Sequence, residues 1–456
     1  MDSTKSARRT AVRGASAPPP LHNQMQIELV EISSLKLNDH SARRFKLLDD
    51  RTANQIIAAQ KIIPPLVVSS DGTVLVGEVI FRAAQRLQIA SLAVIRIDGM
   101  TEAELQAVAV SYQRLGELGE WDRDQLAKLH LRFEVEIADY APEQIGFEVG
   151  AIDLMIGEQE EGADELDGDD PVPEAIPVSR VGDLWTLGKH RICCGDSTDP
   201  ATIARLMSGV RLAAMVFTDP PFGCAINGFV AGEGRHREFV MGSGEMSQAE
   251  LAVFFSAFIT AIVSHLKSGA VVEVVIDWRS LHLLLDAAVP LLGPLVNLAV
   301  WAKDRPGQGS FLRSQHELVL IFKAGKGRFR NNVQLGRLGR SRSNVWSYPS
   351  AKTASKGSDE GNMLANHPTP KPVRLVADAI LDCTRRGDIV LDAFLGSGTT
   401  LMAAEKVGRV CHAAELDPLY VDLAIRRWQA WTGECAMNAD TGRTFDETAL
   451  EAIAHF

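Results

Sequence analysis

The sequence predicts an α/β protein whose larger part is a doubly wound, mostly parallel sheet preceded by a smaller α/β domain. Three observations lead to this fold class. Short apolar runs alternate with helical patterns from about residue 184 to residue 431. Polar or glycine-containing motifs directly follow two of those runs, where ligands bind in open α/β sheets. The 456 residues also exceed the length of one ordinary core, so more than one domain is expected.

The first part of the chain predicts a small α/β domain over residues 25–150. Residues 1–24, rich in Ser, Ala, Arg and Pro, predict a disordered tail. A helical extension is expected from 101 to 147. The elements expected before it are strand 27–32, helix 50–60, strands 65–68 and 73–76, helix 81–87 and strand 92–97.

An acidic linker is predicted at residues 151–178. Eight acidic residues and no basic one lie between Glu158 and Asp170, and prolines follow closely. This segment supplies most of the net charge of −11. By contrast, no acidic residue occurs from Leu318 to Ser358, a segment rich in Lys and Arg. The overall acidity therefore does not argue against a polyanionic partner, because a ligand responds to local charge.

The second domain is predicted over residues 179–456, opening with a short hairpin near 182–192. Strands alternating with helices follow it. The expected order is helix 199–208, strand 212–217, helix 247–267, strand 270–276, helix 279–289, strands 296–302 and 317–322, helix 371–385, strand 388–393, helix 398–407, strand 409–415 and helix 418–431.

The residues Asp219-Pro220-Pro221-Phe222 follow the apolar run 212–217 and suit the handling of a planar amine. The carboxylate accepts hydrogen bonds, the prolines fix the direction of a backbone carbonyl, and the ring of Phe222 offers a face for stacking. Two acceptors that each take one N–H can free the lone pair of an exocyclic base amine for attack on a methyl group. The four residues alone are equally typical of a proline-stiffened turn in which Asp219 caps a helix.

The stretch 389–400 predicts a strand, a glycine turn and the start of a helix. Gly396 and Gly398 let backbone approach a ligand, and Thr399 suits a first helical turn. A P-loop is excluded because no lysine follows the second glycine. Glu415 ends the next strand, where a carboxylate accepts from two ribose hydroxyls in Rossmann folds. The pattern indicates a nucleoside without a pyrophosphate.

Several motifs, taken in order, resemble those of the β class of amino-methylating DNA methyltransferases. Residues 219–222 are similar to the catalytic motif, which usually ends in Tyr, and residues 391–400 to the S-adenosylmethionine motif. The catalytic motif comes first and a long variable region separates the two, as in that class. Further matches lie at 195–197, 313–317, 367–372 and 415–420, so the resemblance covers about residues 180–434.

The resemblance implies roles for individual residues. The target base would be held by Asp219, Pro220, Pro221 and Phe222. The implied cofactor-binding residues are Asp196 at the adenine, Phe394, Gly396 and Gly398 in the methionine-side loop, Asp392, Ser397 and Thr399 in the same motif, Glu415 at the ribose, and His367, Thr369 and Lys371 flanking the methionine carboxylate. Asp196 also fits a simple cap of the helix at 199. His316 and Glu317 are left as supports of the base or of a loop. Ala393, where the family usually has Pro, is expected to tune affinity only.

The basic segment lies where this class keeps its target-recognition region, expected at about 323–366. The absence of acidic residues favours contacts to DNA phosphates over a merely solvated face. The residues predicted to bind DNA are Lys323, Lys326, Arg328, Arg330, Arg337, Arg340 and Arg342.

The N-terminal domain resembles the ParB-like domain of chromosome-partition proteins. The resemblance is carried by residues 63–68, the Asp71-Gly72 turn, Gly77-Glu78 and Arg82. The apolar run 79–81 stands where the family usually has another Gly or Arg, so nucleotide hydrolysis or nuclease activity is not expected. The sequence predicts a helper domain that binds DNA or a partner, with a phosphate contact by Arg82 left open.

The sequence thus predicts an S-adenosylmethionine-dependent methyltransferase acting on double-stranded DNA. Adenine N6 is the expected target because the motif begins with Asp219, and cytosine N4 is the alternative. A non-catalytic DNA-binding regulator and a methyltransferase for an RNA or protein amide are the other readings. No metal and no membrane segment are implied, a homodimer is left open, and the six scattered cysteines favour the cytoplasm.

Overall fold

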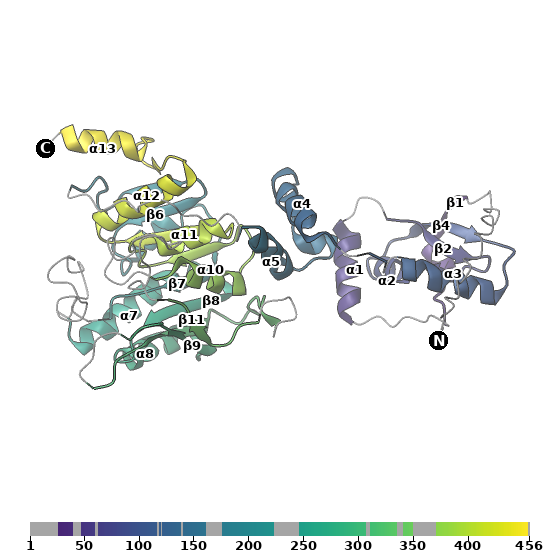
Figure 1. Cartoon of the computed structure of the whole chain (residues 1–456), viewed down its shortest axis with the longest axis horizontal. Coiled ribbons are helices and arrows are strands. Elements are labelled where there is room, and N and C mark those ends of the chain that lie inside the picture. Colours follow the sequence, from purple (N-terminus) through teal and green to yellow (C-terminus); the bar gives the residue numbers. More distant parts are fainter. Residues whose placement is uncertain are drawn as a thin grey trace, which may run out of the picture. The chain divides into compact units, whose positions relative to one another are not determined.

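The chain divides into two compact units, Met1–Phe147 and Glu148–Phe456, each with its own sheet (Figure 1). The computed structural model describes residues 26–39, 47–59, 63–115, 118–119, 121–137, 140–160, 176–222, 246–306, 311–334, 341–349 and 371–454. Among the helices in these ranges, none has both the length and the apolar character needed to cross a membrane.

The first unit is a four-stranded sheet in the order β1-β4-β2-β3 with helices around it, which confirms the small α/β domain. β2 runs parallel to β4, and the other pairs are antiparallel. Its core joins Leu66 and Val68 of β2, Val94 of β4 and Phe81 of α2. Its elements are β1 (Ile27–Glu31), α1 (Leu47–Ala59), β2 (Leu66–Ser69), β3 (Val74–Val76), α2 (Glu78–Arg86), β4 (Ser91–Ile97), α3 (Glu102–Leu115) and α4 (Arg123–Glu136), with 3-10 turns at Ile32–Ser34 and Pro142–Ile145.

Local chemistry explains how α2 and the hairpin before it form. Asp71 accepts hydrogen bonds from the hydroxyls of Ser69 and Thr73, which closes the β2–β3 turn. Gly77 precedes α2 with φ of +94°, a conformation that favours glycine. Arg82 forms an ion pair with Glu78 one helical turn earlier, at 2.7 Å, so part of its charge is used within α2.

The second unit is a ten-stranded sheet in the order β11-β9-β10-β8-β7-β12-β13-β6-β5-β14. The five central strands, β8, β7, β12, β13 and β6, are parallel to one another. β10 is antiparallel to both β8 and β9. The strands are β5 (Leu184–Leu187), β6 (His190–Cys194), β7 (Ala213–Thr218), β8 (Leu266–Ile276), β9 (Asn297–Ala302), β10 (His316–Lys323), β11 (Val345–Ser347), β12 (Ile389–Asp392), β13 (Val410–Glu415) and β14 (Met437–Asn438).

Helices cover both faces of this sheet, which confirms the doubly wound fold (Figure 1). One buried cluster joins the sheet to α10, α11 and α12, and the other joins it to α6, α7 and α8. β7 is buried on both sides, because Met215 and Phe217 face the first cluster while Val216 faces the second. The helices are α5 (Val149–Glu160), α6 (Pro200–Leu206), α7 (Gln248–Val263), α8 (Leu281–Leu292), α10 (Val373–Cys383), α11 (Thr399–Lys406), α12 (Pro418–Thr432) and α13 (Phe445–Ala454).

Capping residues fix where several helices begin. α6 and α12 both start with an Asp-Pro pair, in which Asp199 or Asp417 accepts from a backbone N–H and the proline takes the first helical position. α7 starts with a capping box between Ser247 and Glu250. Asp196 is therefore not the cap of α6, because Asp199 has that role.

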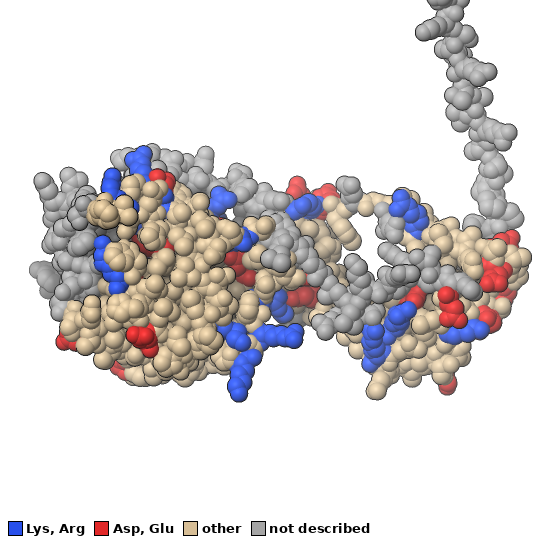
Figure 2. All heavy atoms as spheres, turned by 90° about the horizontal axis from the view of Figure 1, so that it is seen from below, with Lys and Arg blue, Asp and Glu red and all other residues tan. Residues whose placement is uncertain are grey.

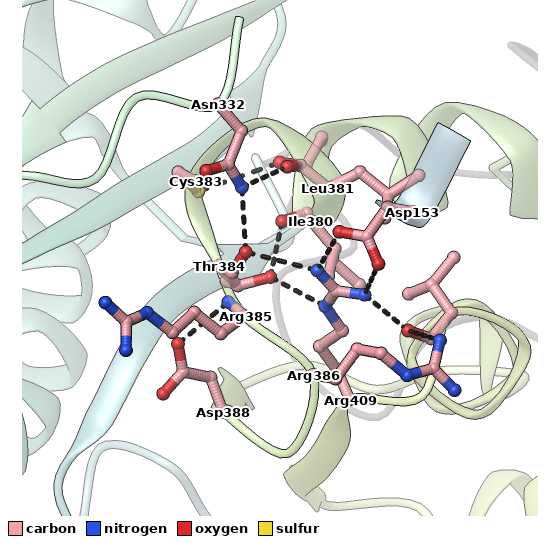
Figure 3. Close-up of polar contacts among 12 residues, drawn as sticks. Asp153, Asn332, Ile380, Leu381, Cys383, Thr384, Arg385, Arg386, Asp388 and Arg409 are labelled. Atoms are coloured by element: carbon pink, nitrogen blue, oxygen red, sulfur yellow. Dashed lines mark hydrogen bonds and ion pairs between the residues drawn. The ribbon is translucent and has the colours of Figure 1, made fainter. Parts of the chain in front are cut away.

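The first ten residues of the predicted 151–178 linker are helical and belong to the second unit, which corrects that part of the prediction. Asp153 of α5 pairs through both carboxylate oxygens with Arg409, at 2.9 and 2.6 Å, and both side chains are almost fully buried (Figure 3). Arg409 also donates to Thr384 and to the carbonyl of Val407. This network, drawn in Figure 3, fixes α5 to the loops after α10 and α11. The acidic stretch 161–175 lies outside the described residues.

Candidate active site

Four neighbouring parallel strands, β7, β12, β13 and β6, end at one edge of the sheet, and each brings a carboxyl group there. Asp219 follows β7, Asp392 ends β12, Glu415 ends β13, and Asp196 lies two residues after β6. Ligands of open α/β sheets bind at this carboxyl edge. The fold therefore brings the candidate catalytic residue and the candidate cofactor residues to the same edge, although about 170 residues separate Asp219 from Asp392.

A buried hydrogen bond connects the end of β7 to the glycine turn. The hydroxyl of Thr218 donates to Asp392 at 2.8 Å and accepts from the backbone N–H of Ala393 at 3.1 Å. Asp392 also accepts from the N–H of Phe394 at 3.0 Å. Burial raises the pKa of Asp392 to about 6, against the opposing effect of these hydrogen bonds. Asp392 thus supports the turn from behind and ties it to the residue that precedes Asp219.

Glu415 closes the turn from the next strand. One of its oxygens accepts from the N–H of Gly396 at 2.8 Å, and the other accepts from the N–H of Asp417 at 2.9 Å. Burial raises the pKa of Glu415 to about 7. Because each carboxylate oxygen has more than one lone pair, both remain able to accept a further hydrogen bond.

The glycine turn itself has the conformation that its sequence predicts. Gly396 and Gly398 have φ of +54° and +92°, in the region that favours glycine. A Cβ added to Gly398 would lie 2.9 Å from the Cβ of Ala424 in α12, so the turn packs closely on that helix. Ser397 and Thr399 are buried beside it.

The remaining cofactor candidates have mixed surroundings. Phe394 is half-buried, and its ring packs against Phe254 and Phe258 of α7, with ring centroids 5.5 and 5.1 Å away. Asp196 accepts from the N–H and hydroxyl of Thr198, both at 2.8 Å, in a local turn. His367 and Thr369 lie outside the described residues.

The two carboxylate oxygens of the catalytic candidate Asp219 have different surroundings. Its Oδ2 forms a short ion pair with the ammonium group of Lys371, whereas its Oδ1 is buried and has no hydrogen-bond partner among the described residues. Burial raises the pKa of Asp219, and nearby Glu317 adds to this effect while Lys371 opposes it. The sequence had placed Lys371 beside the methionine carboxylate of the cofactor. In the fold its side chain instead contacts the catalytic motif.

Glu317 and Lys303 complete this charged group. Lys371 lies 3.2 Å from Glu317, and Lys303 contacts the other oxygen of Glu317 at 2.5 Å. Burial alone would raise the pKa of Glu317, but Lys371 and Lys303 outweigh it and hold the pKa at about 2. Lys303 was not singled out from the sequence. Its place in the sequence is the one indication of a role, because the end of β9 and the start of β10 lie side by side in this antiparallel pair.

The rest of the motif is anchored at its end. Pro220 is buried, and Pro221 and Phe222 are half-buried. The carbonyl of Phe222 accepts from the hydroxyl of Ser280 at 3.0 Å, and its side chain packs against the cluster under α7 and α8. The motif therefore keeps a defined path up to residue 222, and residues 223–245 lie outside the described part.

Of the residues predicted to contact DNA phosphates, Lys323, Lys326, Arg328 and Arg330 lie toward the edge of the sheet opposite Asp219. Glu317, the second residue of β10, lies at the carboxyl edge, and Lys323 ends β10 opposite Val271, in the middle of β8. Six residues of strand separate Lys323 from Glu317, or about 20 Å. Lys326, Arg328 and Arg330 continue from this opposite edge, where the N–H of Gly327 donates to Ser268.

Arg342 is also engaged inside the fold. Its guanidinium group lies over the ring of Trp346, 4.6 Å from the centroid, and pairs with Asp382 at 2.9 Å. It therefore holds β11 against α10 rather than facing solvent. Arg337 and Arg340 lie outside the described residues. On the face drawn in Figure 2, the described basic and acidic side chains are interspersed.

The sheet order brings these carboxyl groups to the edge where open α/β sheets bind ligands. Residues 213–426 match the family model described as DNA methylase. The match begins with β7 and includes Asp219, Lys371, the glycine turn and Glu415.

Two curated relatives match shorter stretches. The chain is 33% identical over 93 residues to the type II methyltransferase M.ScaI of Streptomyces caespitosus, covering 20% of this chain and 30% of that protein. It is 30% identical over 141 residues to the type II methyltransferase M.HinfI of Haemophilus influenzae, covering 29% and 39%. The chain thus spans about a third of the length of these relatives.

Solved structures similar to each part are distant. The PvuII DNA methyltransferase, which is cytosine-N4-specific, covers 61% of this chain and 94% of its own, with 18% identity and a TM-score of 0.41. The chromosome-partitioning protein ParB from Caulobacter crescentus covers 31% and 87%, with 15% identity and a TM-score of 0.25.

Proposed function

We propose that this protein transfers a methyl group from S-adenosylmethionine to the exocyclic amine of a base in double-stranded DNA, with adenine N6 as the preferred target. One observation supports this most strongly. Asp219 presents a buried carboxylate oxygen, with no partner in the described part of the chain, at the same sheet edge as the glycine turn and Glu415. A buried acceptor without a donor is costly unless a ligand completes it.

The residues at this edge fit S-adenosylmethionine. Each carboxylate oxygen of Glu415 can accept a further hydrogen bond from a ribose hydroxyl. Gly396 and Gly398 have no side chains, so a ligand can approach the backbone of the turn closely. Asp196 lies next to Glu415, because the N–H of Gly195 donates to the carbonyl of Glu415 at 2.8 Å. When bound, the cofactor supplies a methyl group activated by a positively charged sulfur.

The chain's own groups would prepare the amine. Asp219 Oδ1 accepts one N–H of the base, and the proline-directed carbonyl of the motif accepts the other, so the nitrogen lone pair leaves conjugation with the ring. Asp219 also takes the proton that the amine must lose when the methyl group is transferred. Phe222 offers part of its ring to the base, which must leave the duplex to reach this edge.

The choice of base depends on the first residue of the motif. Asp at the first position of the motif favours adenine N6 over cytosine N4. Mass spectrometry of nucleosides from DNA treated with the purified full chain and S-adenosylmethionine separates the two, because N6-methyladenine and N4-methylcytosine differ in mass and retention. Appearance of N4-methylcytosine alone would overturn the choice of adenine.

The non-catalytic alternative is a DNA-binding regulator that uses the methylase fold as scaffold. Isothermal titration with S-adenosylmethionine discriminates it, because a scaffold has no need to bind the cofactor. Parallel reactions with RNA and with protein acceptors test the remaining alternative. Transfer to either of these and none to duplex DNA would refute the proposed substrate.

We assign the first unit the role of a ParB-like helper domain that binds DNA or a partner, and place the enzyme in the cytoplasm with its DNA substrate. A homodimer remains compatible with this assignment. Residues 25–150 as the helper domain and 179–456 as the methyltransferase domain are part of the same proposal.

A further inference from the structure

Four charged side chains from separate parts of the second unit alternate in sign around Asp219. In spatial order they are Asp219, Lys371, Glu317 and Lys303, joined by the ion pairs described above. Asp219 follows β7, Lys371 precedes α10, Glu317 belongs to β10, and Lys303 follows β9. The fold therefore gathers a balanced set of two cations and two anions at the carboxyl edge.

Lys371 has little freedom within this group. Its side chain is only 7% exposed, and it contacts two carboxylates at once. The ring of Trp301 lies beneath both lysines, with ammonium-to-centroid distances of 4.6 Å for Lys303 and 5.9 Å for Lys371. A cation held by two anions and near an aromatic face keeps one position.

This arrangement makes the two oxygens of Asp219 unequal. Oδ2 is occupied by Lys371, and Oδ1 is buried and meets no hydrogen-bond donor from the residues that the structure describes. We infer that Lys371 is a positioning residue, which holds Asp219 through Oδ2 so that Oδ1 is the oxygen offered to the substrate amine. Glu317, which also pairs with Lys303, limits how strongly Lys371 attracts Asp219. The inference rests on the proposed function, because it assigns the amine to Oδ1.

If Lys371 and Glu317 act on Asp219 through their charges, replacing either one changes the pKa of Asp219, whereas a purely packing role would leave that pKa unchanged. The charged groups acting on Asp219 are Lys371, Lys303 and Glu317, and Asp392 of β12 lies close enough to interact with it. Removing the charge of Lys371 leaves Asp219 buried beside Glu317, so the pKa of Asp219 should rise. Removing the charge of Glu317 leaves Lys371 to Asp219 alone, so the pKa of Asp219 should fall.

The test compares Lys371→Met with Glu317→Gln in the full-length protein. The kcat for methyl transfer to duplex DNA should fall at low pH as Asp219 becomes protonated, which gives the pH profile an acid limb. That limb should move to higher pH in Lys371→Met and to lower pH in Glu317→Gln, each by about one unit or more. In Lys371→Met, kcat should fall on the order of 10- to 100-fold while the Kd for S-adenosylmethionine stays unchanged.

Lys267→Met is the matched control, because it removes a Lys–Asp pair of similar length, 2.8 Å to Asp388, at the other edge of the sheet. It should move neither the limb nor kcat. Lys371→Arg keeps the charge in a different geometry and should keep the limb in place while kcat falls. Acid limbs that do not move, or that move in the same direction in both variants, would overturn the inference. A large loss of cofactor affinity in Lys371→Met would do so as well, and would return Lys371 to the cofactor.

A second readout does not depend on catalysis. ¹³C NMR of protein labelled at the Asp carboxyl carbons follows the titration of Asp219 directly, with its signal identified by loss in Asp219→Asn. The same opposite displacements are expected in the two variants. If the protein methylates nothing but the NMR displacements occur, the proposed function fails while the charge balance around Asp219 stands. If methylation occurs and the NMR signal does not move, only the role of Lys371 fails.

Discussion

The buried pair between Asp153 and Arg409 allows the sharpest prediction about the architecture. Both side chains are almost fully buried, and the guanidinium group makes two bonds of 2.9 and 2.6 Å to the carboxylate. Asp153→Ala leaves that cation in the core with only the neutral acceptors Thr384 and Val407. Removing one partner of such a pair costs about 3–5 kcal/mol.

Native-state hydrogen exchange measures this loss of stability separately for each helix and strand. Amides of α5 and β13 should exchange on the order of 100-fold faster or more in Asp153→Ala, the equivalent of about 3 kcal/mol. The double variant Asp153→Leu with Arg409→Met removes both charges and should recover most of the loss. Lys267→Met, which breaks a half-exposed pair, should cost no more than about 1 kcal/mol.

Two shortened chains extend the same test. A chain that begins at Glu148 keeps α5, whereas one that begins at residue 176 loses it and leaves Arg409 unpaired. The shorter chain should unfold at lower urea concentration by the amount seen for Asp153→Ala. Equal stability of the two chains, or unchanged exchange in Asp153→Ala, would refute the claim that α5 is an integral part of the second unit.

Three further predictions concern the site, the core and the opposite edge. Gly398→Asp should lower the affinity for S-adenosylmethionine at least about tenfold by calorimetry, because φ is +92° and the new Cβ would meet Ala424; unchanged affinity would refute the assignment of the turn. Burial raises the pKa of Glu273 to about 8, so the folded state favours the protonated carboxyl group. The contribution of this group to the free energy of unfolding is therefore complete below its ordinary pKa and is lost as pH rises through 8. Glu273→Gln should therefore gain stability relative to the parent on the order of 2 kcal/mol between pH 6 and pH 9, and a pH-independent difference in urea unfolding would contradict this. Replacing both Lys326 and Arg328 by Ala should leave kcat/KM for duplex DNA within about twofold, since they lie at the far edge, and a loss of tenfold or more would show that DNA reaches that edge.

Much of the fold could be predicted because each element carries its own local signal. The apolar run before Asp219 is β7, and the strand before the glycine turn is β12, each as expected from burial on both faces. The helices after Asp199 and Asp417 begin where an Asp-Pro pair predicts them. These features depend on residues close together in the chain, so no tertiary information was needed.

Elements with weak local signals were missed. β11 spans three residues, Val345–Ser347, in a segment without clear periodicity, and it is held by Arg342 stacking on Trp346. α5 precedes the acidic run and was merged with it, although Asp153 anchors the helix through a residue 256 positions away. Neither contact is visible from spacing along the chain.

The site shows the same division between local and long-range information. Glu415 and the glycine turn meet as their motifs predict. The contact of Lys371 with Asp219 could not be predicted, because it joins residues 152 positions apart in the sequence. The far position of Lys323 likewise follows from the antiparallel register of β10 against β8, which a count of basic residues does not reveal.

The central claim is that Asp219 and the glycine turn serve one reaction, the first at the base and the second at the methyl donor. Transfer of labelled methyl groups to duplex DNA by the purified parent and by Asp219→Ala, with calorimetry of S-adenosylmethionine binding to both, tests it most directly. The account predicts that both proteins bind the cofactor with similar affinity and that only the parent labels DNA. Labelling by Asp219→Ala at the parental rate, or no cofactor binding by the parent, would contradict it.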